Sequence, residues 1–306
     1  MSILKKIRNY IYNPQILKRV VLNHLGSLIK DDATFIKLKW KVSDMQYPLN
    51  LENPKTFSEK LQWLKLHDRK PIYTIMVDKV EAKKYVASII GEEYIIPTIA
   101  VWNSVDEIDW NVLPSQFVMK CSHDSGGIVI CKDKSKLNKR KATEIMRKGL
   151  KRRYFWQNRE WPYKDVTPRI IVEEYMEDKE TNELRDYKFF CFDGVVKALF
   201  IASERQKKGE ETKFDFFDEN YNHLPIINGH PNAAVIPQKP IRFEDMKVLA
   251  SKLSKGFPHL RVDFYEMNGK IYFGELTFSH WSGMVPFEPV EWDYKLGEWI
   301  ILPTEK

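Results

Sequence analysis

The stretch RVDFYEMNGKIYFGELT, residues 261–277, decides the expected fold. Two runs rich in β-branched and aromatic residues flank an Asn-Gly pair, which is a strong signal for a β-hairpin. A two-residue loop would send Asp263 and Glu275 to opposite faces, whereas a three-residue loop over 267–269, ending in a left-handed glycine, puts them on one face. We expect the three-residue loop, because it separates polar from apolar side chains and burial of one face specifies register.

In this register one face of the hairpin carries oxygen ligands beside Arg261. Mg²⁺ is held in proteins by one or two carboxylates, with substrate phosphates and water completing its octahedron. We therefore predict a metal site formed by Asp263, Glu275 and Thr277. The opposite, apolar face is expected to hold Val262, Phe264, Tyr272, Leu276 and Phe278. The alternative is an exposed hairpin with ordinary surface acids.

The composition is that of a soluble globular protein with a core. The 306 residues are 43% hydrophobic and 30% charged, which leaves room for one large domain or about two to three lobes. No apolar run approaches the roughly 18–20 residues that a membrane span needs, and we expect no signal peptide. Three cysteines without a CxxC motif favour neither a disulfide framework nor a cysteine zinc site.

The net charge of +7 predicts anionic partners: phosphates, an anionic polymer or a membrane surface. Residues 3–29 interleave apolar positions with Lys and Arg, a pattern that lies on anionic lipid in some proteins and more often packs on the protein itself. Residues 132–153 are also basic and are followed by aromatic residues, as in some nucleic-acid-binding proteins. We instead expect the solvated face of a helix over 137–150, or a dock for a phosphorylated substrate, and no nucleic-acid partner.

A glycine-containing loop joins two short strands in the middle of the chain. The first strand, 117–120, ends in Lys120, and the loop 121–127 leads into a strand over 128–130. A Walker loop would run from a strand into a helix, so this order excludes a P-loop and favours a hairpin flap. Successive backbone N–H groups of such a flap can form an anion-binding concavity. The alternative is an ordinary glycine hairpin.

Other elements flank this flap. A helix is expected over 72–90, with Asp78-Lys79 in its first half, and another over 243–255. A buried strand over 169–172 runs into a Glu-Glu linker, where backbone groups at an apolar wall could hold an adenine ring. Lys188 lies in a later strand among aromatic residues, where a lone ammonium is costly unless an anion pairs with it.

This order of elements resembles the ATP-grasp superfamily over residues 76–284. In that superfamily, a lysine after an Asp in the first lobe and a second lysine on the strand before the flap contact the phosphates of ATP; Lys79 and Lys120 match them. The hinge Val-Glu-x-φ-φ, where φ is apolar, matches residues 172–176. The metal signature Arg-x-Asp followed by Glu-x-Asn matches the hairpin, with Thr277 where asparagine is usual.

Four segments are similar to the TupA-like branch of that superfamily. They are NPKTFSEKLQW at 53–63, KCSHDSGG at 120–127, REWPY at 159–163 and VEEY at 172–175. Proteins of this branch are tied to bacterial surface polysaccharides such as teichuronopeptide and capsule, and they are often labelled glycosyltransferases.

The resemblance implies an α+β fold in which two α+β lobes clasp ATP between antiparallel sheets. Its parts would be a helical N-terminal region over 1–75, an N-lobe with the flap over 76–170 and a C-lobe with the metal hairpin over 171–306. The activity implied is ATP- and Mg²⁺-dependent ligation of a carboxylate and an amine through an acyl-phosphate. The substrates would be saccharide- or nucleotide-sugar-linked, with the amine joined to a uronic-acid or peptide unit.

The resemblance also implies roles for individual residues. The catalytic residues would be Arg261, Lys120 and Lys188, and the metal ligands Asp263, Glu275 and Thr277. The residues that bind ATP would be Lys79, Lys120, Ser125, Gly126, Gly127, Glu173, Glu174, Tyr175, Met176 and Lys188. His123 and His280 would orient substrate or move a proton, with a structural role as the alternative for both.

Other functions stay open at this point. A glycosyltransferase would depend on a nucleotide sugar, and the sequence contains no Asp-x-Asp metal motif to support it. A non-catalytic ATP-binding or scaffold protein would show no ATP hydrolysis. We expect a cytoplasmic protein, with peripheral contact to the inner face of the membrane as an alternative.

Overall fold

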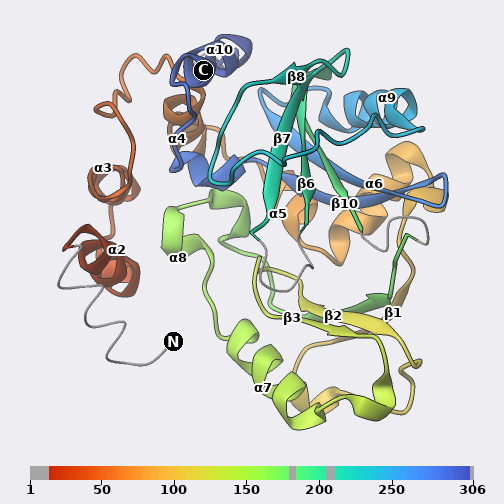
Figure 1. Cartoon of the computed structure of the whole chain (residues 1–306). Helices are drawn as coiled ribbons and strands as arrows, with labels where there is room; N and C mark the ends of the chain where they lie inside the picture. Colours follow the sequence, from red (N-terminus) through yellow and green to blue (C-terminus); the bar gives the residue numbers. More distant parts are fainter. Residues whose placement is uncertain (1–13, 179–183, 205–210, 304–306) are drawn as a thin grey trace.

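The computed structural model describes residues 14–178, 184–204 and 211–303, and within them two antiparallel sheets lie one above the other (Figure 1). The smaller sheet has the order β1 (Thr98–Trp102), β4 (Ile170–Glu174), β2 (Phe117–Cys121), β3 (Ile128–Cys131). The larger sheet has the order β10 (Lys270–Thr277), β9 (Leu260–Met267), β5 (Asp186–Phe192), β6 (Val195–Ser203), β7 (Lys213–Asp218), β8 (His223–Leu224). The fold is α+β, as expected.

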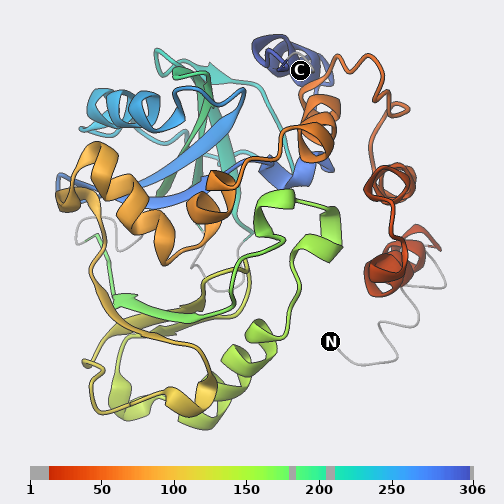
Figure 2. The same ribbon diagram turned by 180° about the vertical axis from the view of Figure 1, so that it is seen from behind.

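Helices pack on both faces of the larger sheet and beneath the smaller one (Figures 1 and 2). On the larger sheet, α6 (Glu81–Ile90) and α9 (Phe243–Ser254) pack on one face, and α4 (Phe57–His67) and α10 (Glu291–Trp299) pack on the other. Beneath the smaller sheet lies α7 (Lys139–Leu150). The remaining helices are α2 (Pro14–Leu25), α3 (Asp32–Val42), α5 (Ile72–Val77) and α8 (Phe155–Asn158).

Alternation along the strands gives the larger sheet an apolar layer on each face. Phe189 joins the cluster under α6 and α9, whereas its neighbour Phe190 joins the cluster under α4 and α10. The ring of Phe190 meets that of Phe57 on α4 at a centroid distance of 5.8 Å. Each fully buried phenylalanine contributes about 1.5–3 kcal/mol relative to an exposed one. Helical N-terminal residues are therefore part of the core of the larger sheet.

The hairpin presents the expected polar face, but the expected loop is wrong. The loop consists of Asn268-Gly269, both with positive φ (50° and 72°), which is the two-residue form that Asn-Gly favours. A register shift at Gly274 then adds one residue to β10. With the two-residue loop alone, Asp263 and Glu275 would lie on opposite faces. The extra residue in the bulge reverses this, so Asp263 and Glu275 are directly opposed and share a face.

The bulge also corrects the expected apolar face. Between the loop and the bulge, Tyr272 lies opposite Tyr265, so it is on the polar side rather than the apolar one. Ile271 and Phe273 occupy the apolar core in its place, with 3% and 5% of their surface exposed.

The expected continuous helix over 72–90 is wrong, because the chain breaks between α5 and α6. At the break, the backbone N–H of Lys79 donates to the carbonyl of Ser122, at the start of the flap, at 3.1 Å. A tertiary hydrogen bond therefore replaces an intrahelical one. This contact brings Lys79 out of the helix and next to the flap.

The elements near the expected domain boundaries are distributed between the two sheets. Helix α6, placed by sequence in the N-lobe over 76–170, packs on the larger sheet. Strand β4 crosses the expected 170/171 boundary and lies inside the smaller sheet. Part of the expected N-terminal helical region, residues 1–13, lies outside the described residues.

Helix α4 packs on α10, the last helix of the described residues. Thr56 and Glu59 form a capping box that starts α4. The carboxylate of Asp293 on α10 accepts hydrogen bonds from the Ser58 N–H at 2.9 Å and the Tyr47 hydroxyl at 2.5 Å. The helices approach so closely at Gly297 that an added Cβ would lie 2.2 Å from the carbonyl oxygen of Lys55.

We predict that Gly297→Ala lowers the free energy of unfolding by about 1–3 kcal/mol in urea denaturation, because backbone must move to admit the methyl group. The matched control is Glu298→Ala, which changes the next, exposed residue of the same helix. A Gly297→Ala protein at least as stable as wild type would show that the two helices are not packed this closely.

Candidate active site

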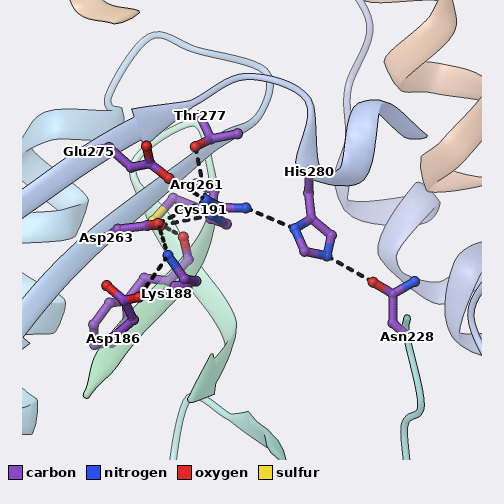
Figure 3. A network of polar contacts seen from close by, with 10 residues as sticks. Asp186, Lys188, Cys191, Asn228, Arg261, Asp263, Glu275, Thr277 and His280 are labelled. Carbon is purple, nitrogen blue, oxygen red and sulfur yellow. Dashed lines mark hydrogen bonds and ion pairs between the residues drawn. The ribbon is translucent and has the colours of Figure 1, made fainter. Parts of the chain in front are cut away.

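Three neighbouring strands bring the predicted charged residues into one row on the larger sheet (Figure 3). Asp263 on β9 lies opposite Lys188 on β5 and Glu275 on β10. Arg261 precedes Asp263 by two positions on the same strand, so both side chains are on one face. Thr277 lies opposite Arg261. The register alone therefore assembles the hairpin residues with Lys188.

The Arg261 guanidinium is the centre of this group, with 9% of its side chain exposed. Its Nε and Nη2 donate to the two oxygens of Asp263, both at 2.8 Å. Its Nη2 also donates to Glu275 Oε1 and to Thr277 Oγ1, both at 3.0 Å. Burial acts to lower the pKa of Arg261, but the charge of Asp263 outweighs it and raises the pKa, so the guanidinium stays charged.

His280 positions Arg261 from the other side (Figure 3). The Arg261 Nη1 donates to His280 Nδ1 at 2.9 Å, and His280 Nε2 donates to Asn228 Oδ1 at 2.8 Å. Burial and the Arg261 charge hold the pKa of His280 well below its usual value. The imidazole is therefore neutral, and with both nitrogens engaged it is an orienting group in this structure.

Cations surround the carboxylate of Glu275. Burial acts to raise its pKa, but the charges of Lys188, Lys79 and Arg261 prevail and lower it to about 2. Lys188 itself forms an ion pair with Asp263. The lowered pKa keeps the carboxylate of Glu275 ionised. Because 39% of its side chain is exposed, this carboxylate is also open to a ligand.

Lys120 is held by Glu173, which also holds a lysine that sequence reasoning missed. Glu173 Oε2 pairs with Lys120 and Oε1 with Lys83, each at 2.5 Å. Burial acts to raise the pKa of Glu173, and the two lysines lower it. Lys83 lies four positions after Lys79, a spacing that could have indicated a shared side of the chain.

The expected hinge residues divide into two groups. Glu173 lies within the ladder between β1 and β2, and its carboxylate is occupied by lysines. Tyr175 and Met176 follow the end of β4. Backbone groups outside the ladder therefore belong to the residues after β4 rather than to Glu173.

Two cavities flank the lysines. One, of 220 Å³, lies beside the smaller sheet and is lined mainly by apolar residues. Its lining is Ile96, Val118, Lys120, Ile128, Ile130, Glu173, Glu174, Tyr175, Met176, Leu184 and Tyr265. The sequence-predicted hinge residues thus lie together at an apolar wall.

The second cavity, of 440 Å³, contains the polar face of the hairpin. Its charged lining residues are Lys79, Lys188, Arg261, Glu275 and Glu160. Aromatic side chains line it as well, namely Tyr154, Tyr163, Phe200, Phe214 and Trp281. A small gap lined by Lys79, Lys120, Glu173 and Glu275 lies between the two cavities.

The glycine flap is held against α7. His123 Nε2 donates to the carbonyl of Arg152 at 3.0 Å, and the Arg152 side chain pairs with Asp124 at 2.6 Å. Ser125 lines the larger cavity. Gly126 and Gly127 lie close to Arg152 and to Gly149 of α7. Of the three predicted flap residues, Ser125 is the one that this conformation places at the cavity.

A left-handed turn at 281–283 closes the far side of the larger cavity. Trp281 and Ser282 have φ of 48° and 56°, a conformation that costs about 1–3 kcal/mol for a residue other than glycine. Gln62 Nε2 stabilises the turn by donating to the carbonyls of Ser282 and Gly283, both at 2.9 Å. The sequence contained no signal for this turn.

Comparison with known proteins identifies the family. The family model described as TupA-like ATPgrasp matches residues 59–301. The chain belongs to the TupA-like ATP-grasp family. The match includes both sheets and all the residues predicted for the site, and it confirms the resemblance stated from the sequence.

Several solved structures are similar to this TupA-like ATP-grasp chain. D-alanine–D-alanine ligase from Helicobacter pylori is 15% identical, with 75% of this chain and 62% of that chain covered and a TM-score of 0.40. ATP-grasp ligase PsnB with a phosphomimetic precursor variant, Mg and ADP is 9% identical, with 73% and 58% covered and a TM-score of 0.42. D-cycloserine synthetase DcsG is 15% identical, with 76% and 72% covered and a TM-score of 0.39. The chain thus spans less than two thirds of the length of the first two, and comparison with curated proteins gave no match.

Neither a cluster of metal-binding side chains nor a membrane-spanning helix occurs among the described residues. They contain no group of three or more His, Cys, Asp or Glu side chains arranged to hold a metal ion. They also contain no helix with the length and apolar character to cross a membrane. The hairpin itself supplies two carboxylates, Asp263 and Glu275, and the hydroxyl of Thr277.

Two buried histidines behind the site predict how stability depends on pH. Burial lowers the pKa of His259 to about 3 and that of His280 well below its usual value. Each binds a proton in the unfolded chain below about pH 6.5 but not in the folded one, so folding stability falls as the pH drops below that value. One such group costs about 1.4 kcal/mol per pH unit.

We predict that His259→Phe reduces the loss of stability between pH 7.5 and 5.5 by about 1.4 kcal/mol, measured by urea denaturation at both values. The control is Phe192→Leu, which changes a buried aromatic neighbour of His259 without adding or removing a titratable group and should lower stability equally at both pH values. An identical pH dependence in wild type and His259→Phe would show that His259 is protonated in the folded protein.

Proposed function

We propose that this protein is an ATP-dependent carboxylate–amine ligase that attaches an amine or amino acid to a uronic-acid or peptide unit of a bacterial surface polysaccharide. One observation carries the proposal: Lys79, Lys120, Lys188 and Arg261 converge where an apolar cavity approaches a polar one. ATP has an apolar base at one end and anionic phosphates at the other, and this pair of cavities matches it. Membership of the TupA-like ATP-grasp family supports the same assignment.

In this proposal the adenine lies in the apolar cavity. Ile128 and Ile130 of β3 form one wall, and Glu174, Tyr175 and Met176 line the other side. Glu173 acts indirectly, by holding Lys120 and Lys83. The phosphates extend into the larger cavity and are bound by Lys120, Lys79 and Lys188. The flap residues Ser125, Gly126 and Gly127 cover them.

The donor set of the hairpin fits Mg²⁺ in part. Glu275 is ionised and partly exposed, as a carboxylate ligand must be. Asp263 is fully buried, with its oxygens bonded to Arg261 and Lys188, so it can bind a metal only if Lys188 turns away. Thr277 Oγ1 already accepts from Arg261. We therefore assign Glu275 as the main protein ligand, with Asp263 and Thr277 completing the set; a bound Mg²⁺ would neutralise phosphate charge.

The chemistry has two stages. A carboxylate oxygen of the first substrate attacks the γ-phosphorus of ATP, and the bond to the ADP oxygen breaks. The amine nitrogen then attacks the acyl carbon, a C–N bond forms and the C–O bond to phosphate breaks. Lys79, Lys120 and Lys188 balance phosphate charge. Arg261, oriented by His280, faces the negative charge that develops on the acyl oxygen.

The aromatic lining of the larger cavity supports a saccharide-linked substrate. Trp281 is 41% exposed there, and its ring stacks on that of Phe214 at a centroid distance of 6.1 Å. Aromatic faces with a polar edge suit the alternating apolar and hydroxyl surfaces of a sugar ring. We place the reaction in the cytoplasm, the compartment that supplies ATP.

The proposal is tested by ADP release from Mg·ATP with a panel of amino acids and amines, each paired with D-glucuronate or UDP-D-glucuronate. We expect ADP when both partners are present. Turnover of a nucleotide sugar alone, without ADP, would support a glycosyltransferase instead. Absence of ADP with every pairing would contradict the ligase.

We predict that Asp263→Asn and Glu275→Gln each lower Mg-dependent ADP release by about 100-fold or more, because each removes a charge that the phosphate site needs. Glu266→Gln is the matched control, since it changes an acid on the same hairpin outside both cavities. Circular dichroism checks that the variants fold. Near-wild-type turnover in Glu275→Gln would show that the hairpin does not supply the metal ligands.

A further inference from the structure

Two acids line the larger cavity, and their surroundings differ. The charges of Lys188, Lys79 and Arg261 act on Glu275 and lower the pKa of its carboxylate. Glu160 is hydrogen-bonded by neutral groups, Ser282 and Tyr154. Anionic groups of a substrate are attracted to the cations around Glu275, so Glu160 is the acid suited to a cationic group.

Glu160 is rigidly held. The neighbouring Arg159 is fully buried and donates to the carbonyls of Gly26 and Ile29, both at 2.7 Å, and pairs with Asp32 at 2.8 Å. These contacts fix residues 159–160 to the N-terminal helical region. Glu160 therefore lies at the cavity because of long-range packing.

The carboxylate of Glu160 is buried, with 3% of the residue exposed. Its Oε1 accepts a hydrogen bond from the Ser282 hydroxyl, whose oxygen in turn accepts from Asn158 Nδ2 at 2.9 Å. The Tyr154 side chain interacts with the same carboxylate. These are neutral partners, which orient the group without neutralising it.

No basic side chain among the described residues forms an ion pair with Glu160. The nearest buried ammonium, Lys65, donates to the carbonyls of Asn158 and Ser282, both at 3.0 Å, and burial lowers its pKa to about 7. Burial likewise raises the pKa of Glu160. The charge of Lys65 on α4 acts on this carboxylate and offsets part of the cost of its burial, and a cationic ligand in the cavity would offset the rest.

The geometry points to Glu160 as the docking site for the ammonium group of the amine substrate and as the acceptor of its proton. The inference rests on the proposed ligase activity and adds a residue to it. The carboxylate takes one proton from R–NH₃⁺, giving R–NH₂ and a neutral Glu160. The freed electron pair forms the C–N bond as phosphate leaves, and the second nitrogen proton passes to phosphate or solvent.

The groups around Glu160 fit this role. Its own charge raises the pKa of Tyr154, which therefore remains a protonated hydrogen-bond donor. Burial raises the pKa of Tyr163. Arg261 and Glu160 line the same cavity, so an acyl group bound by Arg261 and an amine bound by Glu160 would share one space.

The test separates amine binding from acyl-phosphate formation. Wild type and Glu160→Gln are incubated with Mg·ATP and UDP-D-glucuronate or D-glucuronate, with either hydroxylamine or the amino-acid panel as nucleophile. Hydroxylamine is largely neutral at neutral pH, so hydroxamate formation needs no ammonium site. We expect Glu160→Gln to lower the ratio of amide to hydroxamate by about tenfold or more, through a higher KM for the amino acid.

Two further variants keep the test decisive. The double variant Glu160→Gln/Lys65→Met removes both buried charges together. It is used in the same assay if the single variant Glu160→Gln does not fold. Glu291→Gln changes an exposed acid on α10 and should leave the ratio unchanged.

An unchanged ratio, or equal loss of amide and hydroxamate, would overturn the assignment, because either result means that Glu160 does not act on the amine. If wild type forms no hydroxamate with either carboxylate, the proposed ligase itself fails and the inference falls with it. The two failures are thus distinguishable.

Discussion

The bidentate pair between Arg261 and Asp263 is the interaction on which the site depends. A buried guanidinium is tolerated only with its donors satisfied, and here Asp263, Glu275, Thr277 and His280 satisfy them. The register of β5, β9 and β10 makes this possible, since it aligns Lys188, Asp263 and Glu275 in one row. The arrangement leaves Glu275 as the exposed carboxylate and buries Asp263 behind Lys188.

From this centre, charge is distributed unevenly through the larger cavity. Lys79, Lys188 and Arg261 act on Glu275, whereas Glu160 forms no ion pair with a described residue and has Lys65 as its nearest buried ammonium. Such an arrangement suits a reaction that joins an anionic substrate to a cationic one, because each partner is drawn to the opposite charge before reaction. The strained turn at Trp281 and Ser282 closes the cavity between them, and α4 holds it in place through Gln62 and Lys65.

Local patterns predicted the elements but not the contacts between them. Alternation of polar and apolar residues indicated the right faces for Asp263 and Glu275. It could not distinguish the loops, because a three-residue loop and a two-residue loop with a bulge both put these two residues on one face. The helical periodicity over 72–90 gave no indication of the hydrogen bond from the Lys79 N–H to the Ser122 carbonyl, where the helix is interrupted. Glu160 reaches the cavity because Arg159 is anchored to residues far away in sequence, which no local pattern encodes.

The most direct test of this account is a crystal structure with Mg²⁺ and the β,γ-imido analogue of ATP. The account predicts the base in the cavity beside Ile130 and Met176, the phosphates on Lys79, Lys120 and Lys188, and Mg²⁺ at about 2.0–2.1 Å from a Glu275 oxygen. Phosphates bound away from these lysines, or a metal held by residues outside the hairpin, would contradict the central claim that Arg261 organises a phosphate-transfer site.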